Sequence, residues 1–160
     1  MRIVLGIDPG YDRLGVALIK KDGHQEELIY SDCFLSNKKA PLSKRLFSLG
    51  DQVEKMIKTW QPTEVAMEKL YFTVNQKTAL AVAESRGMIS YLCARYNLPL
   101  SEYTPTEIKL TIAGYGRADK KQINEMIKLL LKKPLSPKFD DEMDAIAIAL
   151  TSVAKTPLAR

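Results

Sequence analysis

The sequence has little of what several common classes of protein require. Cysteine occurs only at Cys33 and Cys93 in 160 residues, and the two form no CxxC pair, which excludes a disulfide framework and a thiolate zinc site. His24 is the single histidine, so zinc sites built on two imidazoles are also excluded. This cysteine usage favours the reducing cytoplasm as the compartment.

Long hydrophobic runs are also lacking. No apolar stretch approaches the roughly 20 residues that span a bilayer, so we expect a soluble chain without a membrane partner. The first ten residues, MRIVLGIDPG, do not resemble a signal peptide, because an acid interrupts the apolar run at position 8. The length predicts a single domain over residues 1–156, followed by a short C-terminal tail at 157–160.

Positive charge is in moderate excess and is unevenly distributed. Lys and Arg number 24 against 19 Asp and Glu, a formal net charge of +5. The segment 107–138 alone holds eight basic residues and three acidic ones. Such a segment is typical of a surface that binds a polyanion, although a solvated helix face has the same composition.

Hydrophobic periodicity predicts alternating strands and helices. Strands are expected at 3–8, 14–20, 27–34, 63–68 and 98–103, and helices at 40–60, 75–97, 106–113, 118–131 and 140–154. Three strands in hairpin order, followed by alternating helix and strand, predict an α/β fold. We expect a five-stranded mixed sheet with helices on both faces. Asp140 or Asp141 is well placed to cap the last helix.

Four acidic residues occupy positions where an active site could form. Asp8 ends the first predicted strand and Glu68 the fourth, while Asp141 and Asp144 share one face near the start of the last helix. Sites in open α/β sheets assemble at the carboxyl ends of strands. Each acid alone also has a structural explanation, because Asp forms turns before Pro-Gly and caps helices.

The presence of all four acids at positions that could form one site is harder to explain by turns and caps alone. Carboxylates brought within ~4 Å of one another would repel by about 4 kcal/mol per pair at an effective dielectric near 20. Hard cations would make that arrangement tolerable. Oxygen ligands without a histidine or cysteine set indicate Mg²⁺ or Mn²⁺.

Five sequence blocks in order carry a family resemblance. They are GIDPGYDRLGVALI, AMEKLYF, ESRG, YTPTEIKLTIAGYGRADKKQ and DDEMDAIAIALT, which together span about residues 3 to 151. In this order and spacing the chain resembles the RuvC family of bacterial Holliday junction resolvases. The resemblance implies an RNase H-like fold, a homodimer and a Mg²⁺-dependent endonuclease. Such an enzyme resolves four-way DNA junctions in recombination and repair by paired symmetric nicks.

The resemblance also implies an active site. The catalytic and metal-binding acids of the family correspond to Asp8, Glu68, Asp141 and Asp144. They would hold two Mg²⁺ ions per active site, with Mn²⁺ able to substitute, for two-metal phosphodiester hydrolysis. Asp140 precedes the third of these acids and is the neighbouring candidate for its position. The implied partners are the DNA junction and the RuvA–RuvB branch-migration complex.

The basic segment contains the candidate DNA-binding residues. The family's DNA-contacting lysines correspond to Lys109 and Lys120, and Arg117 and Lys121 flank the same Gly114–Gly116 loop. The two glycines of that loop would let its backbone approach a phosphate strand closely.

An aromatic pair follows the second acid. Tyr71 corresponds to an aromatic residue of the family that stacks on bases at the junction centre. From the residues alone, Tyr71 and Phe72 are equally well explained as anchors of the hydrophobic core.

Two other classes of function stay open. The first phosphate loop of actin and sugar-kinase phosphotransferases also resembles GIDPG, but those proteins close two domains over a nucleotide, and this chain predicts one. No GxxxxGK[ST] loop is present either. A non-catalytic nucleic-acid binder would explain the basic segment but not four acids in family register. Junction nicking, ATP turnover, or binding without product distinguishes the three classes.

Overall fold

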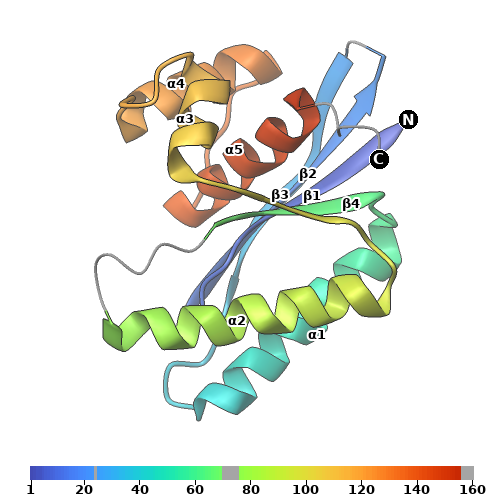
Figure 1. Ribbon diagram of the computed structural model, residues 1–160, viewed down its shortest axis with the longest axis vertical. Helices are drawn as coiled ribbons and strands as arrows, with labels where there is room; N and C mark the ends of the chain where they lie inside the picture. The colour runs from blue at the N-terminus through green and yellow to red at the C-terminus, as the bar shows by residue number, and fades with distance from the viewer. Residues whose placement is uncertain (24, 70–75, 156–160) are drawn as a thin grey trace.

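The architecture is a five-stranded mixed sheet, seen in the computed structural model, which describes residues 1–23, 25–69 and 76–155 (Figure 1). The strand order is β3-β2-β1-β4-β5. The first three strands in sequence pair antiparallel, and β4 and β5 extend the sheet in parallel with β1. The predicted fold class is thereby confirmed. The strands are β1 (Arg2–Asp8), β2 (Arg13–Asp22), β3 (Gln25–Leu35), β4 (Glu64–Glu68) and β5 (Leu100–Tyr103).

Helices cover both faces of this sheet, as predicted (Figure 1). Because side chains alternate along a strand, β1 sends Val4 into one core and Leu5 and Ile7 into the other. The first core lies under α3, α4 and α5, and the second lies under α1 and α2. The helices are α1 (Leu42–Trp60), α2 (Gln76–Arg95), α3 (Pro105–Ala113), α4 (Lys120–Leu131) and α5 (Asp140–Ala154).

Helix α5 lies unusually close to the sheet. A Cβ atom on Gly6 of β1 would overlap the carbonyl oxygen of Ala145, and one on Gly15 of β2 would overlap the carbonyl oxygen of Asp141. Glycine is therefore required at both contact points, since any side chain would push the helix away. This close packing places the first turns of α5 beside the end of β1, where Asp8 stands.

The start of α5 corrects one prediction. Asp140 and Asp141 are not its N-cap, because the cap is Phe139 and makes no side-chain hydrogen bond. The two carboxylates turn instead toward cations from other elements, Asp140 toward Lys120 and Asp141 toward Arg13. Within the first turn these acids still favour the helix electrostatically, because its N-terminal end carries partial positive charge.

Some predictions lie outside the described residues. The tail predicted at 157–160 falls in the undescribed segment 156–160, and Tyr71 and Phe72 fall in 70–75. Among the helices that the structure does describe, none is long and apolar enough to cross a membrane.

Candidate active site

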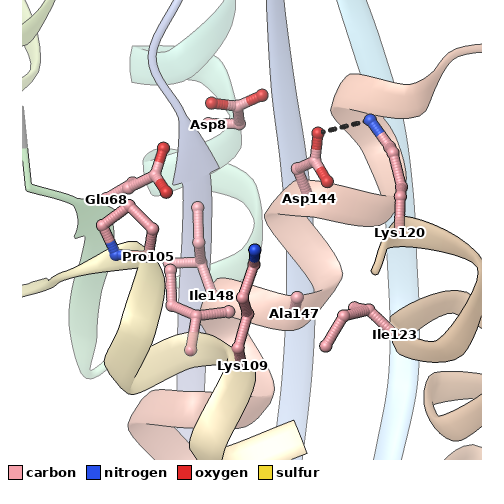
Figure 2. A pocket seen from close by; sticks show the side chains of 10 residues that line it. Asp8, Glu68, Pro105, Lys109, Lys120, Ile123, Asp144, Ala147 and Ile148 are labelled. Atoms are coloured by element: carbon pink, nitrogen blue, oxygen red, sulfur yellow. Dashed lines mark hydrogen bonds and ion pairs between the residues drawn. The ribbon is translucent and has the colours of Figure 1, made fainter. Parts of the chain in front are cut away.

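A cavity of about 400 Å³ opens at the carboxyl ends of β1 and β4. Three carboxylates and two ammonium groups face it, from the ends of β1 and β4 and from α3, α4 and α5 (Figure 2). Its remaining walls are apolar side chains of α3, α4 and α5. The charged lining residues are Asp8, Glu68, Lys109, Lys120 and Asp144, and the apolar ones include Ile108, Ile123, Ala147 and Ile148.

Asp8 is the acid whose charge is least compensated. It ends β1 opposite Gly15 of β2, next to the start of α5. Burial raises its pKa most, and the negative charges of Asp144, Glu68 and Asp141 raise it further, to about 8. At neutral pH the Asp8 carboxyl therefore retains a proton unless a cation replaces it.

Glu68 occupies the equivalent position at the end of β4. Burial raises its pKa, the charge of Asp144 adds to this, and the cations Arg86 and Lys109 oppose it. Its backbone carbonyl accepts a hydrogen bond from the Arg86 guanidinium. The Lys109 ammonium points from α3 into the same cavity (Figure 2). Glu68 thus projects toward the cavity from the end of β4, whose backbone is held by Arg86 of α2.

Asp144 lines the cavity and forms an ion pair with a lysine. Lys120, at the start of α4, donates from Nζ to Asp144 Oδ2 at 3.1 Å (Figure 2) and lies 3.3 Å from Asp140 Oδ2. Burial nevertheless raises the pKa of Asp144, against the opposing effect of Lys120. The Asp140 side chain is 74% exposed and does not line the cavity, unlike Asp144.

Asp141 does not line the cavity, although its charge contributes to the raised pKa of Asp8. Its Oδ2 lies 3.0 Å from Nε of Arg13, an ion pair without a hydrogen bond, and the same oxygen is buried. The Arg13 guanidinium also lies over the Phe139 ring, 5.5 Å from its centroid. Arg13 was not among the predicted site residues, although it stands in the first family block, GIDPGYDRLG.

The donor set fits a hard divalent cation. The acids around the cavity offer only oxygen, the charge of Lys120 offsets only part of the effect of burial and neighbouring acids on Asp8, and Asp141 Oδ2 is buried without a hydrogen bond. Among residues 1–23, 25–69 and 76–155, no three acidic, cysteine or histidine side chains form a closed metal-ligand group. Lys120 contacts Asp144 and Arg13 contacts Asp141, so each of these two carboxylates lies beside a cation of the protein.

The predicted DNA-binding residues separate into two groups. Lys109 and Lys120 line the cavity, whereas Arg117 and Lys121 are exposed and outside its lining. Lys120 is unexpectedly part of the acidic cluster, because its ammonium contacts carboxylates there. Tyr71 lies outside the described residues.

Comparison with known proteins relates residues 4–152 to one family, described as crossover junction endodeoxyribonuclease RuvC. The RuvC of Petrotoga mobilis is 44% identical over 147 residues, which cover 92% of this chain and 90% of that protein. The RuvC of Desulfitobacterium hafniense is 42% identical over 148 residues, with the same coverage of both chains. The similarity therefore includes every strand and helix that contributes to the cavity.

Solved structures show the same relationship in three dimensions. RuvC of Thermus thermophilus in complex with a Holliday junction substrate superposes with a TM-score of 0.90 at 26% identity, covering 96% of this chain and 93% of that one. The yeast mitochondrial Holliday junction resolvase Ydc2 has a TM-score of 0.68 at 15% identity, a likeness of fold alone. The RNase H-like resolvase fold implied by the sequence is thus confirmed.

Proposed function

The chain belongs to the RuvC family of crossover junction endodeoxyribonucleases, and from this premise we propose that it cleaves four-way DNA junctions by paired nicks in opposing strands. One observation carries the proposal most directly. Asp8, Glu68 and Asp144, three acids identified from the family's sequence blocks, line one cavity together with Lys109 and Lys120. A cavity that combines carboxylates with ammonium groups suits a phosphodiester, whose charge the lysines attract.

We assign two Mg²⁺ ions, replaceable by Mn²⁺, to Asp8, Glu68, Asp141 and Asp144. When bound, such ions stabilise charge on a phosphoryl group and make a water more acidic. The chain's own contribution is the donor set. The Asp8 carboxylate is destabilised by burial and by the negative charges of the neighbouring acids. A divalent cation bound to it would relieve this repulsion, so the position favours a cation. Asp141 would contribute its buried Oδ2, which lacks a hydrogen bond but lies 3.0 Å from Arg13 Nε, so that the ion would take the place of Arg13 as its partner.

Lys109 and Lys120 have different roles in this proposal. The Lys109 ammonium points into the cavity from α3 and lies close enough to lower the pKa of Glu68 (Figure 2). It is placed to contact a DNA phosphate beside the acids. Lys120 balances Asp144 and Asp140, so it contacts a phosphate only when its ammonium leaves these carboxylates. Arg117 and Lys121 are exposed and close to Lys120 in sequence, and we assign them to the basic surface along which a DNA arm would lie.

Tyr71 is assigned to the junction centre on the family resemblance alone. If its ring stacks on an unpaired base, Tyr71→Ala cleaves junctions about tenfold to a hundredfold more slowly and unfolds near the wild-type temperature. Tyr71→Phe retains activity because the aromatic face remains. A large loss of thermal stability in Tyr71→Ala, with normal cleavage by the folded fraction, would instead place the ring in the core.

We propose a homodimer that uses the face shared by α1 and α2. Phe47 is 74% exposed and Tyr91 is 61% exposed, and both line a surface cavity of about 390 Å³ with Leu46 and Met88. Exposed aromatic side chains that share one cavity are typical of a surface covered by a partner. Sedimentation equilibrium of the wild type and of Phe47→Glu tests the dimer, which the added charge should dissociate. Contact with the RuvA–RuvB complex stays a prediction of the resemblance.

The decisive experiment compares a synthetic four-way junction with a linear duplex of matched sequence. We expect Mg²⁺-dependent nicks at symmetric positions of the junction and no comparable cleavage of the duplex. ATP turnover in the same preparation would indicate the phosphotransferase alternative. Junction binding without any product in Mg²⁺ or Mn²⁺ would indicate a non-catalytic binder.

A further inference from the structure

Two consecutive residues of α2 contact the strand ends that carry Asp8 and Glu68. Ser85 is fully buried, and its Oγ donates to the carbonyl oxygen of Gly10 at 3.0 Å, two residues after Asp8. Arg86 donates from Nη1 to the carbonyl oxygen of Glu68 itself. Both side chains therefore hold backbone that neighbours a candidate catalytic carboxylate, without contacting the carboxylates themselves.

We propose that Ser85 and Arg86 are positioning residues, which hold Asp8 and Glu68 at the cavity through the backbone that carries them. This inference rests on the proposed nuclease function. It assigns to α2 a role beyond covering the sheet, although α2 contributes no lining residue to the cavity that the structure describes.

The Ser85 contact restrains the turn between β1 and β2. After Asp8 the chain turns through Pro9 and Gly10 before β2 begins. Tight packing already confines Gly10, because a Cβ there would overlap the carbonyl oxygen of Arg13. The buried Ser85 hydroxyl supplies the Gly10 carbonyl with a partner from a different layer of the fold. The backbone beyond Asp8 is thereby tied to α2 as well as to the sheet.

The Arg86 contact joins three elements at the end of β4. One guanidinium nitrogen binds the Glu68 carbonyl, and the other binds the Glu102 carboxylate of β5. The Arg86 side chain is only 13% exposed, so solvent competes weakly for these bonds. Beyond this point the β4–β5 pairing continues, since the Lys69 amide donates to the Tyr103 carbonyl at 2.7 Å. The planar fork of Arg86 reaches the carbonyl and the carboxylate with separate nitrogens in fixed directions, a geometry that a lysine ammonium at the same position does not reproduce.

Positioning of this kind affects catalysis more than binding. A displacement of about 1 Å in a reacting group can cost roughly a hundredfold in rate. Carboxylates that share a divalent cation are sensitive to such shifts, because octahedral Mg²⁺ tolerates little distortion. DNA phosphate contacts by surface lysines do not depend on the same geometry, so junction affinity should be preserved when the contacts of α2 are lost.

The test uses Ser85→Ala and Arg86→Lys in the full chain. Ser90→Ala, at an exposed position of the same helix, and Lys39→Arg, in an exposed turn, are the controls. The measurements are thermal unfolding, junction binding in Ca²⁺, the single-turnover cleavage rate, and the Mg²⁺ concentration that gives half of that rate. We expect both test variants to bind as wild type, to cleave about 10–100-fold more slowly and to need more Mg²⁺, while the controls match wild type.

Three results would decide against the proposal. One is a wild-type rate and Mg²⁺ requirement in both folded test variants. Another is a slower rate that only parallels weaker junction binding. If Arg86→Lys does not fold, Glu102→Leu removes the acceptor of the same contact at a side chain that is 38% exposed, and a wild-type rate there overturns the role of Arg86. A wild type that nicks no junction would refute the proposed function instead, which keeps the two failures distinct.

Discussion

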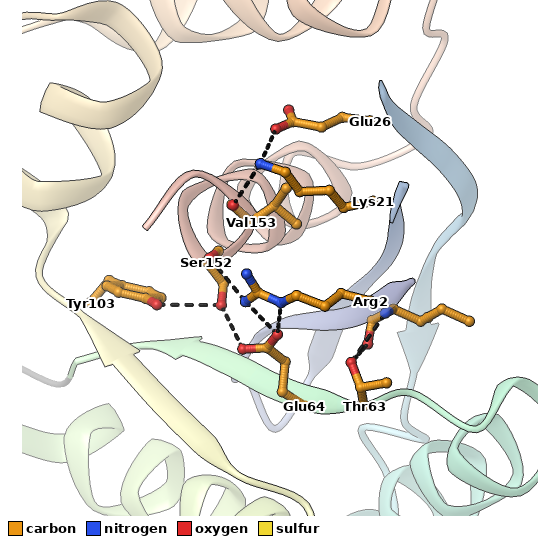
Figure 3. A network of polar contacts seen from close by, with 9 residues as sticks. Arg2, Lys21, Glu26, Thr63, Glu64, Tyr103, Ser152 and Val153 are labelled. Atoms are coloured by element: carbon orange, nitrogen blue, oxygen red, sulfur yellow. Dashed lines mark hydrogen bonds and ion pairs between the residues drawn. The ribbon is translucent and has the colours of Figure 1, made fainter. Parts of the chain in front are cut away.

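The two ends of β4 place acidic side chains in opposite electrostatic settings. Near its start, Glu64 accepts two hydrogen bonds from Arg2, from Nε at 2.8 Å and from Nη2 at 2.5 Å (Figure 3). Its other oxygen accepts from the Ser152 hydroxyl of α5 at 3.2 Å, and the Tyr103 hydroxyl donates to Ser152 Oγ at 3.3 Å. Every charged group of this network has a partner of opposite charge or a hydrogen bond.

At the end of the same strand, four residues later, Glu68 faces Asp8 and Asp144 across the cavity. Here like charges are neighbours, and burial together with their repulsion raises the pKa of Glu68 and of Asp8. Both networks join β1, β4 and α5, so the sheet and helix supply the same scaffold at each end. The paired end therefore serves stability. At the other end, which we call the unpaired end, Asp144 contacts Lys120, but Asp8 and Glu68 make no ion pair with a described residue and stay available to a cation from outside the chain.

The largest expected effect is at the unpaired end. Asp8→Asn should reduce single-turnover cleavage by at least about a hundredfold. Loss of a residue that only supports a metal ligand typically costs about 10–100-fold, and loss of a ligand should cost more. The amide keeps the shape of the side chain but removes its charge, so junction binding in Ca²⁺ should stay near wild type. Asp144→Asn should behave similarly, whereas the exposed Asp140→Asn should be mild. Full cleavage by Asp8→Asn in saturating Mg²⁺ would refute the metal assignment.

The paired end should respond in stability instead. Arg2→Met leaves Glu64, whose side chain is 11% exposed, without its guanidinium. An unpaired buried polar group costs about 1–3 kcal/mol, and each kcal/mol lowers Tm by about 2–4 °C in a chain of this size. Cleavage per folded molecule should not change. The double variant Arg2→Met/Glu64→Leu should recover part of the lost stability, and a failure to recover would argue against the pair as its source.

The pH dependence of stability should distinguish the ends further. The pKa of Asp8 is about 8 in the folded chain against an ordinary 3.8, so the unfolded chain releases a proton that the folded chain keeps. The contribution of Asp8 therefore lowers stability as pH rises from about 4 to about 8. In EDTA, Asp8→Asn should melt several degrees above wild type at pH 8 and close to it at pH 4. An equal difference at both pH values would contradict this origin.

The smallest expected effect concerns the lysines of the cavity. Lys109→Ala and Lys120→Ala should each weaken junction binding and reduce the slope of log affinity against log salt by about 0.9 per lost phosphate contact. Lys120→Ala should lose less of this slope than Lys109→Ala, because Lys120 already contacts Asp144 and Asp140. Unchanged slopes in both variants would place these lysines outside the DNA path.

Much of this protein follows from local sequence. The spacing of hydrophobic residues was sufficient to predict the order of strands and helices and the mixed sheet. Burial of one face gives a strand a two-residue period and a helix a period of about 3.6 residues. Asp8 and Glu68 could be placed together because the parallel strands β1 and β4 end at the same edge. The ordered blocks were sufficient for the family, which the comparisons confirm.

The tertiary structure alone decided which charges meet. Arg13 pairs with Asp141, Lys120 with Asp144, and Arg86 binds the Glu68 carbonyl, each across segments far apart in the chain. The predicted cap of α5 was wrong because the helix already begins at Asp140, which puts Phe139 at the cap position, and the first two carboxylates contact cations of β2 and α4 instead. The carboxylates at the start of α5 lie where they do because α5 packs closely on Gly6 and Gly15 of the sheet. Hydrophobic periodicity predicts a helix at α5 but not its distance from the sheet.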